Sequence, residues 1–277
     1  MFTLNCRGKL IASDTPLVMG IVNATPDSFY KGAPLKGPEG ILALAKKMID
    51  EGADILDIGG QSTRPGSLPV SSEEETERVI PVIELICREF PEAVISIDTY
   101  QSKVAKAAVQ AGASIVNDVS AGEMDEEMIN TVAELKVPYV CMHMKGTPET
   151  MQKYAEYADV IKDLLDYFIA KTEQCKKAGI KDIIIDPGFG FAKTAEQNFT
   201  LLKNLSVFKM FNMPLLVGLS RKSTVHKTLG VTAEEALNGT TVLNTLALNN
   251  GAELLRLHDV RQAREAVLMM TAKPKSI

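Results

Sequence analysis

The stretch from Gly52 to Ser67, GADILDIGGQSTRPGS, decides the fold predicted for this chain. Its first part, residues 53–58, is mostly apolar and β-branched, which is typical of a strand buried on both faces. Asp57 lies near the end of this strand, and the two glycines that follow let the backbone turn. Residues 63–66, Thr-Arg-Pro-Gly, are then expected to form a stiff loop. A carboxylate and a guanidinium at the end of a buried strand are suited to hold a polar or anionic ligand.

Short apolar runs of the same kind recur along the chain and alternate with helical patterns. Apolar residues form a helical stripe over residues 39–51, and Ser72 to Glu75 predict a capping box that opens a helix running to about Phe90. A long helix is predicted from about Tyr154 to Ala178. The predicted strands are Leu17–Val22, 53–58, Ala93–Ile97, Ser114–Val116, Tyr139–Met142, Asp182–Ile185, Pro214–Gly218 and Glu253–Leu255.

This alternation of strands and helices predicts parallel pairing. Eight such units in 277 residues favour an α/β fold of the (β/α)8 TIM barrel type over an open sheet. Residues 3–12 precede them and predict a short N-terminal hairpin that turns at Arg7 and Gly8. Because no linker or change of composition interrupts the chain, we expect residues 1–277 to form a single barrel domain.

The composition, 45% hydrophobic and 23% charged, is ordinary for a soluble globular protein. No stretch approaches the ~20 apolar residues that span a bilayer, and no cleavable signal peptide is visible. Four scattered cysteines without a CxxC pair predict reduced thiols in a cytoplasmic protein. The net charge of −5 and the lack of a basic run argue against nucleic acid. We therefore expect neither a nucleic-acid nor a membrane partner.

Polar residues close the predicted strands, and the carboxyl mouth of a barrel is where active sites are built. Asp and Asn also favour turns, which explains any one of these positions. It does not explain so many of them in one register. The residues are Asn23, Asp57, Asp98, Asn117, His143, Asp186, Lys222, Arg256 and His258.

Two chemistries are compatible with the acids and amides Asp98, Asn117 and Asp186. A carboxylate accepts two parallel N–H bonds from the edge of a 2-amino-pyrimidinone, and an amide pairs with the groups beside it. The same oxygens suit Mg2+. The spacing leaves both readings open.

A second cluster is cationic and indicates an anion site. Loops after the seventh and eighth strands of such barrels often hold phosphate, and Ser223 opens a helix whose free N–H groups favour an anion. Arg221 is expected on the solvated surface. The cluster consists of Arg64, Lys222, Arg256 and His258.

Two loops after strands stand out. The segment Ala24 to Gly37 is longer than the ~2–6 residues usual for such a connection, which predicts a lid. The sequence from Asp186 to Gly190 is not a dinucleotide fingerprint, because Lys193 stands where the third glycine would be needed.

Seven motifs, spread in order from about Leu17 to the C-terminal helix, resemble those of the dihydropteroate synthases. They are Asn23–Phe29, Asp57–Gly66, Ile97–Asp98, Asn117–Asp118, Asp186–Phe191, Gly218–Ser223 and Arg256–His258. The resemblance implies a barrel that joins 4-aminobenzoate to 6-hydroxymethyl-7,8-dihydropterin pyrophosphate in folate biosynthesis. It also implies Mg2+ as cofactor and a homodimer.

Carried over by position, the resemblance implies a role for each site residue. The pterin contacts are Asp98, Asn117, Asp186 and Lys222, and the pyrophosphate contacts are Thr63, Arg64, Arg256 and His258. The 4-aminobenzoate pocket is lined by Phe29, Pro65 and Ser223, and Asn23 coordinates Mg2+ close to Asp57. The residues expected to act in catalysis are Asp57, Arg64, Asp98 and Lys222.

The chain departs from the family pattern in two places. Gln61 stands where the family usually has Glu, and Tyr30 and Lys31 replace the more usual Ser and Asp. Three rival functions are compatible with the residues: a corrinoid-linked methyltetrahydrofolate methyltransferase domain, a Schiff-base aldolase that uses Lys222 as nucleophile, and a pterin-binding protein without catalysis. The methyltransferase would not need the loop at residues 63–66.

Overall fold

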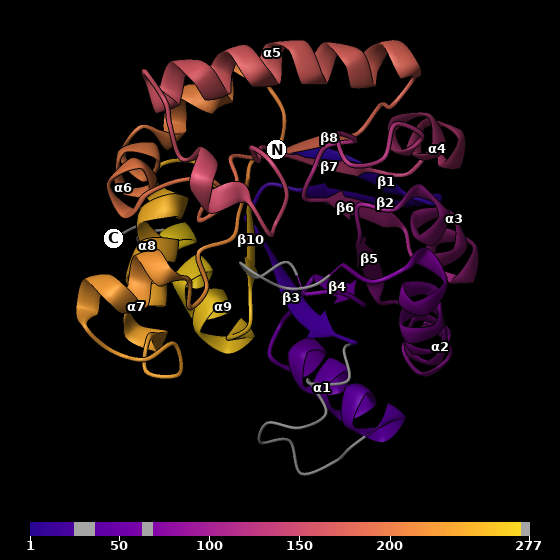
Figure 1. Cartoon of the computed structure of the whole chain (residues 1–277). Coiled ribbons are helices and arrows are strands. Elements are labelled where there is room, and N and C mark those ends of the chain that lie inside the picture. Colours follow the sequence, from indigo (N-terminus) through magenta and orange to yellow (C-terminus); the bar gives the residue numbers. More distant parts are fainter. Residues whose placement is uncertain (25–36, 63–68, 273–277) are drawn as a thin grey trace.

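Eight parallel strands form a barrel that is surrounded by helices (Figure 1). The computed structural model describes residues 1–24, 37–62 and 69–272. The strands follow the order β8-β7-β6-β5-β4-β3-β10-β9. A parallel bridge between Ile185 and Leu215 joins the two ends of this order, and the Ile185 amide donates to the Pro214 carbonyl at 2.9 Å. The predicted TIM barrel is therefore confirmed.

The elements alternate along the chain as the apolar runs predict. The barrel strands are β3 (Leu17–Asn23), β4 (Ile55–Gly59), β5 (Val94–Asp98), β6 (Ile115–Asp118), β7 (Tyr139–Met142), β8 (Ile183–Asp186), β9 (Leu216–Val217) and β10 (Leu254–Leu257). The helices are α1 (Pro38–Asp50), α2 (Ser72–Glu89), α3 (Ser102–Ala111), α4 (Met128–Leu135), α5 (Val160–Ala178), α6 (Ala195–Lys203), α7 (Ser223–Leu229), α8 (Leu237–Asn249) and α9 (Val260–Thr271).

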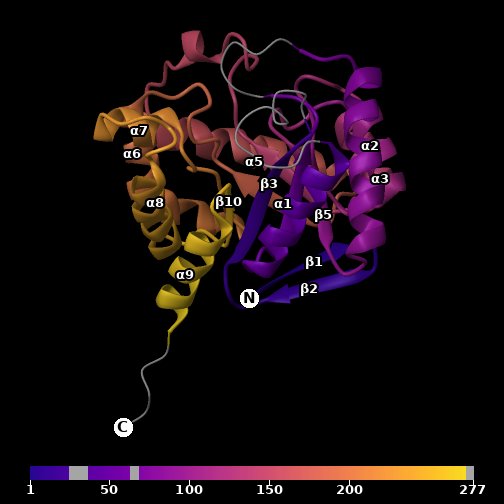
Figure 2. The same ribbon diagram turned by 90° about the horizontal axis from the view of Figure 1, so that it is seen from below.

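The predicted N-terminal hairpin is present. Strand β1 (Phe2–Cys6) pairs antiparallel with β2 (Lys9–Ser13). Both turn residues have positive φ, 54° for Arg7 and 88° for Gly8, which is the backbone of a two-residue type I′ turn. Figure 2 shows the hairpin lying across one end of the barrel.

The interior of the barrel is apolar near the hairpin. The inward side chains at the amino ends of the strands pack against Leu4 and Cys6 of β1 in one buried cluster. Every strand of the barrel contributes to it. The contributing side chains are Leu17, Met19, Ile55, Val94, Ile115, Val140, Ile184, Leu216 and Leu254. This layer seals the barrel, so a ligand can enter its interior from the carboxyl ends of the strands.

Two helix starts differ from the sequence prediction. Helix α2 is capped by Ser71, whose side chain accepts from the Glu74 amide, and not by Ser72. Helix α5 begins at Val160, because the Asp159 carboxylate caps it there. Tyr154, predicted as the start of this helix, is instead the last residue of a separate 3-10 turn, Met151–Tyr154.

Helix length and cysteine state were also predicted from the sequence. No helix among the described residues is long and apolar enough to cross a membrane. Cys6, Cys87, Cys141 and Cys175 are all free thiols.

Candidate active site

The interior of the barrel changes from apolar to polar at the next inward-facing residue of most strands, toward their carboxyl ends. Side chains alternate between the two faces of a strand, so the residue two positions after each apolar one also points inward. At this level five of the strands carry polar side chains, which we call the polar cup; they are buried except for Arg256, which is partly exposed. Its members are Asp57 on β4, Ser96 on β5, Asn117 on β6, Asp186 on β8 and Arg256 on β10.

Arg256 is the centre of the polar cup. Its Nε donates to Asp57 Oδ2 at 2.6 Å, and its Nη2 donates to Asp98 Oδ2 at 2.5 Å. Asn117 donates from Nδ2 to the same Asp57 oxygen at 3.1 Å. The remaining carboxylate oxygens, Asp57 Oδ1 and Asp98 Oδ1, are buried without a hydrogen-bond partner among the described residues. A buried acceptor of this kind is ready for a donor from a ligand.

Two carboxylates sharing one guanidinium leave an excess of negative charge in the polar cup. Burial raises the pKa of the Asp98 carboxyl to about 7; the charge of Arg256 opposes this rise, and the charge of Asp57 adds to it. Burial also works against the charge of Arg256, yet its two carboxylate partners raise the guanidinium pKa. The arginine stays charged, and Asp98 is the group that titrates near neutrality.

Asp186 of the polar cup interacts with a second cation, Lys222, which follows β9. Burial raises the pKa of the Asp186 carboxyl, and the positive charge of Lys222 opposes this. Burial lowers the pKa of the Lys222 ammonium to about 8, with Asp186 opposing and Arg256 adding to the fall. The Lys222 ammonium donates to the Phe189 carbonyl and lies 4.7 Å from the centre of the Phe191 ring.

Three predicted site residues lie at the rim. Asn23 ends β3, where it pairs in register with Gly59 of β4. Ser223 is exposed at the first position of α7, as predicted. His258 is exposed after β10, and its Nδ1 lies 2.9 Å from Ser220 Oγ.

Four further candidates lie outside the described residues, so their predicted roles stay predictions. They are Phe29, Thr63, Arg64 and Pro65. The predicted lid at residues 24–37 and the departure at Tyr30 and Lys31 fall almost wholly in the same undescribed segments.

The prediction that Arg221 lies on the solvated surface is wrong. Its guanidinium makes a bidentate pair with Asp259, at 2.9 Å from Nε and 2.8 Å from Nη2, and donates to two backbone carbonyls of the segment before α8. It joins the loop after β9 to the loop after β10. Its charge is therefore paired away from Lys222, and Arg256 is the cation that acts on that lysine.

The departure at Gln61 has a structural explanation. This buried amide donates to the hydroxyl of Tyr100 and accepts from the Val70 amide at 3.2 Å. Gln can satisfy a donor and an acceptor without adding charge near the buried carboxyl of Glu75, whose pKa burial raises to about 7. The substitution therefore leaves the loop end at residue 70 tied to the end of β5.

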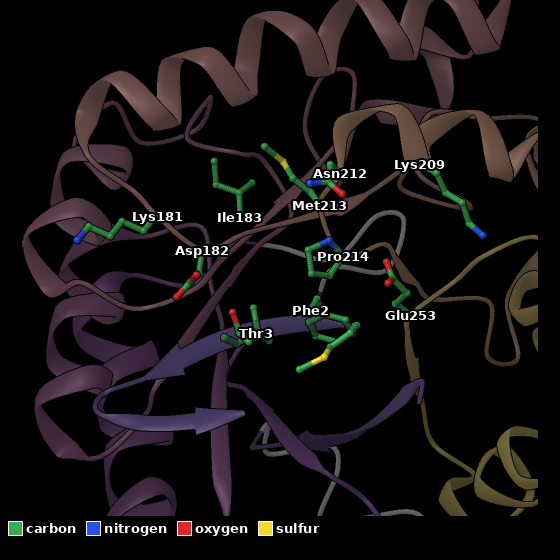
Figure 3. A pocket seen from close by; sticks show the side chains of 12 residues that line it. Phe2, Thr3, Lys181, Asp182, Ile183, Lys209, Asn212, Met213, Pro214 and Glu253 are labelled. Atoms are coloured by element: carbon green, nitrogen blue, oxygen red, sulfur yellow. The ribbon is translucent and has the colours of Figure 1, made fainter. Parts of the chain in front are cut away.

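A hollow of about 470 Å³ opens at the other end of the barrel (Figure 3). It lies between the hairpin and the amino ends of the strands, and Phe2, Asp182 and Pro214 contribute to its lining. The Asp182 carboxylate accepts from the Asn5 amide at 2.9 Å, so this charge ties the hairpin to the barrel. The apolar layer separates this hollow from the polar cup.

Two buried polar residues were not singled out from the sequence. Asp118 follows Asn117, and strand alternation turns it outward, where it accepts from Ser120, Gly122 and the Tyr139 hydroxyl in a structural network. The alternation rule could have revealed this. Lys193 is also buried, at 3% exposure. Its loop carried no periodic signal that would have placed it inside.

Magnesium can be tested against the donors at the mouth. Among the described residues no three His, Cys, Asp or Glu side chains cluster as a metal site. Mg2+ usually takes one or two protein oxygens and fills its other positions with water and substrate phosphates. Asn23 at the end of β3 and Asp57 Oδ1 on the adjacent β4, which has no partner in the described part of the chain, supply oxygen donors of this kind. The residues present therefore fit this cation.

The barrel fold and the polar cup together define a barrel protein with a buried polar site at the carboxyl ends of its strands, which is where enzymes of this fold carry their active sites. Residues 19–258 match the family of pterin binding enzymes. A dihydropteroate synthase from Escherichia coli (strain K12) is 41% identical over 97% of this chain and 95% of its own length. A Xanthomonas albilineans dihydropteroate synthase with 4-aminobenzoic acid superposes with a TM-score of 0.91 at 39% identity, covering 98% and 99% of the two chains.

A structure of the same Xanthomonas enzyme in complex with 7,8-dihydropteroate gives a TM-score of 0.88 at 37% identity and covers 98% of this chain and 100% of that one. The chain therefore belongs to the pterin-binding enzymes and, within them, to the dihydropteroate synthases.

Proposed function

We propose that the polar cup binds the dihydropterin ring and that the chain transfers the pterinylmethyl group to 4-aminobenzoate. The reaction yields 7,8-dihydropteroate and pyrophosphate in folate biosynthesis. The observation that carries this proposal is the buried carboxylate of Asp98, which Arg256 fixes through one oxygen and whose Oδ1 has no hydrogen-bond partner among the described residues. A pterin edge presents parallel N–H donors that such oxygens accept.

Each wall of the polar cup has a proposed role toward the ring. Asp186 and Asn117 accept and donate at the pterin edge, and Asp98 accepts from it once it is ionised. The Lys222 ammonium already has a carbonyl partner, which aims it at the same space. Because Asp98, Asn117 and Asp186 come from strands of one barrel and Lys222 from the loop after β9, the ring is oriented before it reacts.

The reaction then needs little acid–base chemistry. The bond between the pterin methylene carbon and the pyrophosphate oxygen breaks, and pyrophosphate leaves with the electron pair. The carboxylates of Asp57, Asp98 and Asp186 favour the positive charge that develops on the pterin. The neutral aniline nitrogen of 4-aminobenzoate attacks the methylene carbon and afterwards loses a proton to water.

The departing pyrophosphate requires positive charge at the mouth. We propose that Arg64, Thr63 and His258 hold it, that Phe29, Pro65 and Ser223 line the 4-aminobenzoate pocket, and that Asn23 holds Mg2+ near Asp57. When bound, Mg2+ would neutralise part of the pyrophosphate charge. Arg256 is engaged by two carboxylates, so its proposed role is to fix them while its charge faces the leaving group.

Lys222 distinguishes this function from the aldolase alternative. We expect pyrophosphate release that depends on 4-aminobenzoate in the parent chain. Lys222→Arg keeps a cation but cannot form a Schiff base, so it should retain more activity than Lys222→Ala. Equal loss in both variants, together with borohydride trapping of the parent, would support the aldolase instead. No pyrophosphate from the parent with both substrates would indicate a binding protein without catalysis.

We also propose a homodimer and a cytoplasmic location. Val242 and Leu246 of α8 are half exposed and lie one helical turn apart. Leu229 of α7, also half exposed, lies against Gly239 in the same stripe. An apolar stripe of this kind is suited to a second copy of the chain.

Four free thiols, three of them buried, support the proposed cytoplasmic location, because thiols stay reduced in a reducing compartment.

A further inference from the structure

The loop between Asp186 and Lys193 carries backbone groups that form hydrogen bonds with two side chains of the site, Asp186 and Lys222. The Gly188 amide donates to Asp186 Oδ1 at 2.8 Å, and the Phe189 carbonyl accepts from the Lys222 ammonium. The Phe191 ring lies beside the same ammonium. The position of this loop therefore sets the direction of one carboxylate and one cation that face the proposed pterin.

Lys193 joins this loop to the barrel through its ammonium group. Its ammonium donates to the carbonyls of Gly188 at 3.0 Å and Phe191 at 3.1 Å, and it lies 3.0 Å from His143 Nδ1 at the end of β7. An ammonium has three N–H bonds, and here it meets three acceptors in three directions. Two of these acceptors belong to the loop, and the third belongs to the barrel.

Burial makes this arrangement costly, which argues against a role in packing alone. The side chain of Lys193 is 3% exposed, and burial lowers its pKa to about 7. Burial lowers the pKa of His143 to about 2, so the ring is neutral and has one nitrogen that can accept. An apolar side chain would fill the same space without loss of hydration. What the ammonium adds is three directed bonds between the loop and the strand.

The backbone of the loop is also closely packed. Gly188 has φ of +70°, and a Cβ there would come within 2.0 Å of the His143 carbonyl oxygen. The Gly190 amide donates to Asn198 Oδ1 at 2.8 Å. The loop is thus held at Gly190 by α6 and at Gly188 and Phe191 by Lys193. The Phe191 amide also donates to the Gly188 carbonyl at 3.1 Å, so the loop closes a turn of its own, and Lys193 adds the bonds that join this turn to His143.

We propose that Lys193 is a positioning residue for pterin transfer. Through the carbonyls of Gly188 and Phe191 it fixes the loop, and through the loop it fixes the Phe189 carbonyl that aims Lys222 and the Gly188 amide that orients Asp186. The residue itself does not touch substrate. This inference rests on the proposed function, because it assumes that Asp186 and Lys222 face the pterin.

The test compares Lys193→Met with Lys145→Met. Lys145 is a nearby lysine whose ammonium donates to the Glu156 carbonyl and lies over the Tyr157 ring, so its hydrogen bond is made outside the loop. Calorimetric titration with 6-hydroxymethylpterin should show at least about tenfold weaker binding for Lys193→Met, because bonds to a charged group are lost. Lys145→Met should bind like the parent.

A second readout separates positioning from loss of stability. When Lys222 loses its fixed partner it becomes more hydrated, so the alkaline limb of kcat/KM for the dihydropterin substrate should move to higher pH in Lys193→Met. Loss of the Lys193 charge by itself also raises the pKa of Lys222, and it does so equally in Lys193→Gln, so a merely structural role would lower the melting temperature and give both variants the same limb. Lys193→Gln can still donate to two acceptors and should lie between the parent and Lys193→Met. It also decides the matter if Lys193→Met does not fold.

The outcomes are distinct. If the parent binds 6-hydroxymethylpterin and releases pyrophosphate, the proposed function stands. If the Lys193 variants then bind within about twofold of the parent, with the same alkaline limb in both variants, the positioning role is wrong. If the parent itself releases no pyrophosphate, the proposed function fails first.

Discussion

Asp98 shows how one buried position combines structure and chemistry. Its carboxylate shares Arg256 with Asp57, and its second oxygen has no partner among the described residues. Burial holds its pKa near neutrality, whereas the ammonium of Lys222 across the polar cup titrates slightly higher. Pterin binding needs the first group ionised and the second protonated.

These pKa values predict a narrow pH range for pterin binding. The Asp98 carboxylate forms as pH rises through about 7, so affinity should increase up to that point. The Lys193 ammonium that holds the loop is lost as pH rises through about 7, and the Lys222 ammonium is lost as pH rises through about 8, so affinity should fall over this range. Calorimetric titration of 6-hydroxymethylpterin over the neutral range measures both limbs. Asp98→Asn should bind more weakly and lack the acid limb; an acid limb that survives in this variant would assign it to another group.

Asp186→Asn tests whether the Asp186 carboxylate contacts the pterin. An amide cannot accept two parallel N–H bonds, and an unmet buried donor costs about 1–3 kcal/mol, or roughly 5- to 150-fold in affinity. The control is Asp166→Asn, a carboxylate exposed on α5. Both are compared by titration with the same pterin. Parent-like binding by Asp186→Asn would remove this residue from the pterin contacts.

At the scale of elements, the hairpin and the barrel strands divide the interior between stability and chemistry. Inward residues near the amino ends of the strands pack with Leu4, and those one step further form the polar cup. Substitutions in the apolar layer should therefore change the free energy of unfolding and spare pterin binding.

A matched pair within the hairpin tests this division. Leu4 is 1% exposed, so Leu4→Ala should lower the free energy of unfolding by about 2–5 kcal/mol through the cavity it leaves. Leu10 on the partner strand is 65% exposed, and Leu10→Ala should change it by less than about 0.5 kcal/mol. Urea unfolding measures both. Equal effects would mean that the hairpin does not close the barrel as described.

At the scale of the whole molecule, the outer helices determine how copies of the chain meet. The apolar stripe on α7 and α8 predicts that Leu246→Lys shifts a dimer toward monomer, because a buried lysine would lack a partner. Leu44→Lys on α1 replaces a similarly exposed leucine outside the stripe and should leave the dimer intact. Sedimentation velocity distinguishes the two species. A dimer that tolerates Leu246→Lys uses another surface.

Local patterns in the sequence determined the elements, the barrel and the candidate residues. Apolar β-branched runs predicted the eight strands, and Arg7 and Gly8 predicted the hairpin turn, because these signals act over a few neighbouring residues. The polar strand ends predicted the side of the barrel that carries the site, since the carboxyl ends of parallel strands share one mouth.

The tertiary structure decided which of those side chains meet. Arg256 pairs with Asp57 across 199 residues, Arg221 pairs with Asp259 across 38, and Lys193 reaches His143 across 50. Such pairs depend on how the barrel closes and on which face each residue takes. A shift of β4 by one residue in register would turn Asp57 outward and leave Arg256 with Asp98 as its remaining carboxylate partner. The charge balance of the polar cup is therefore a property of the closed barrel, because no local segment contains it.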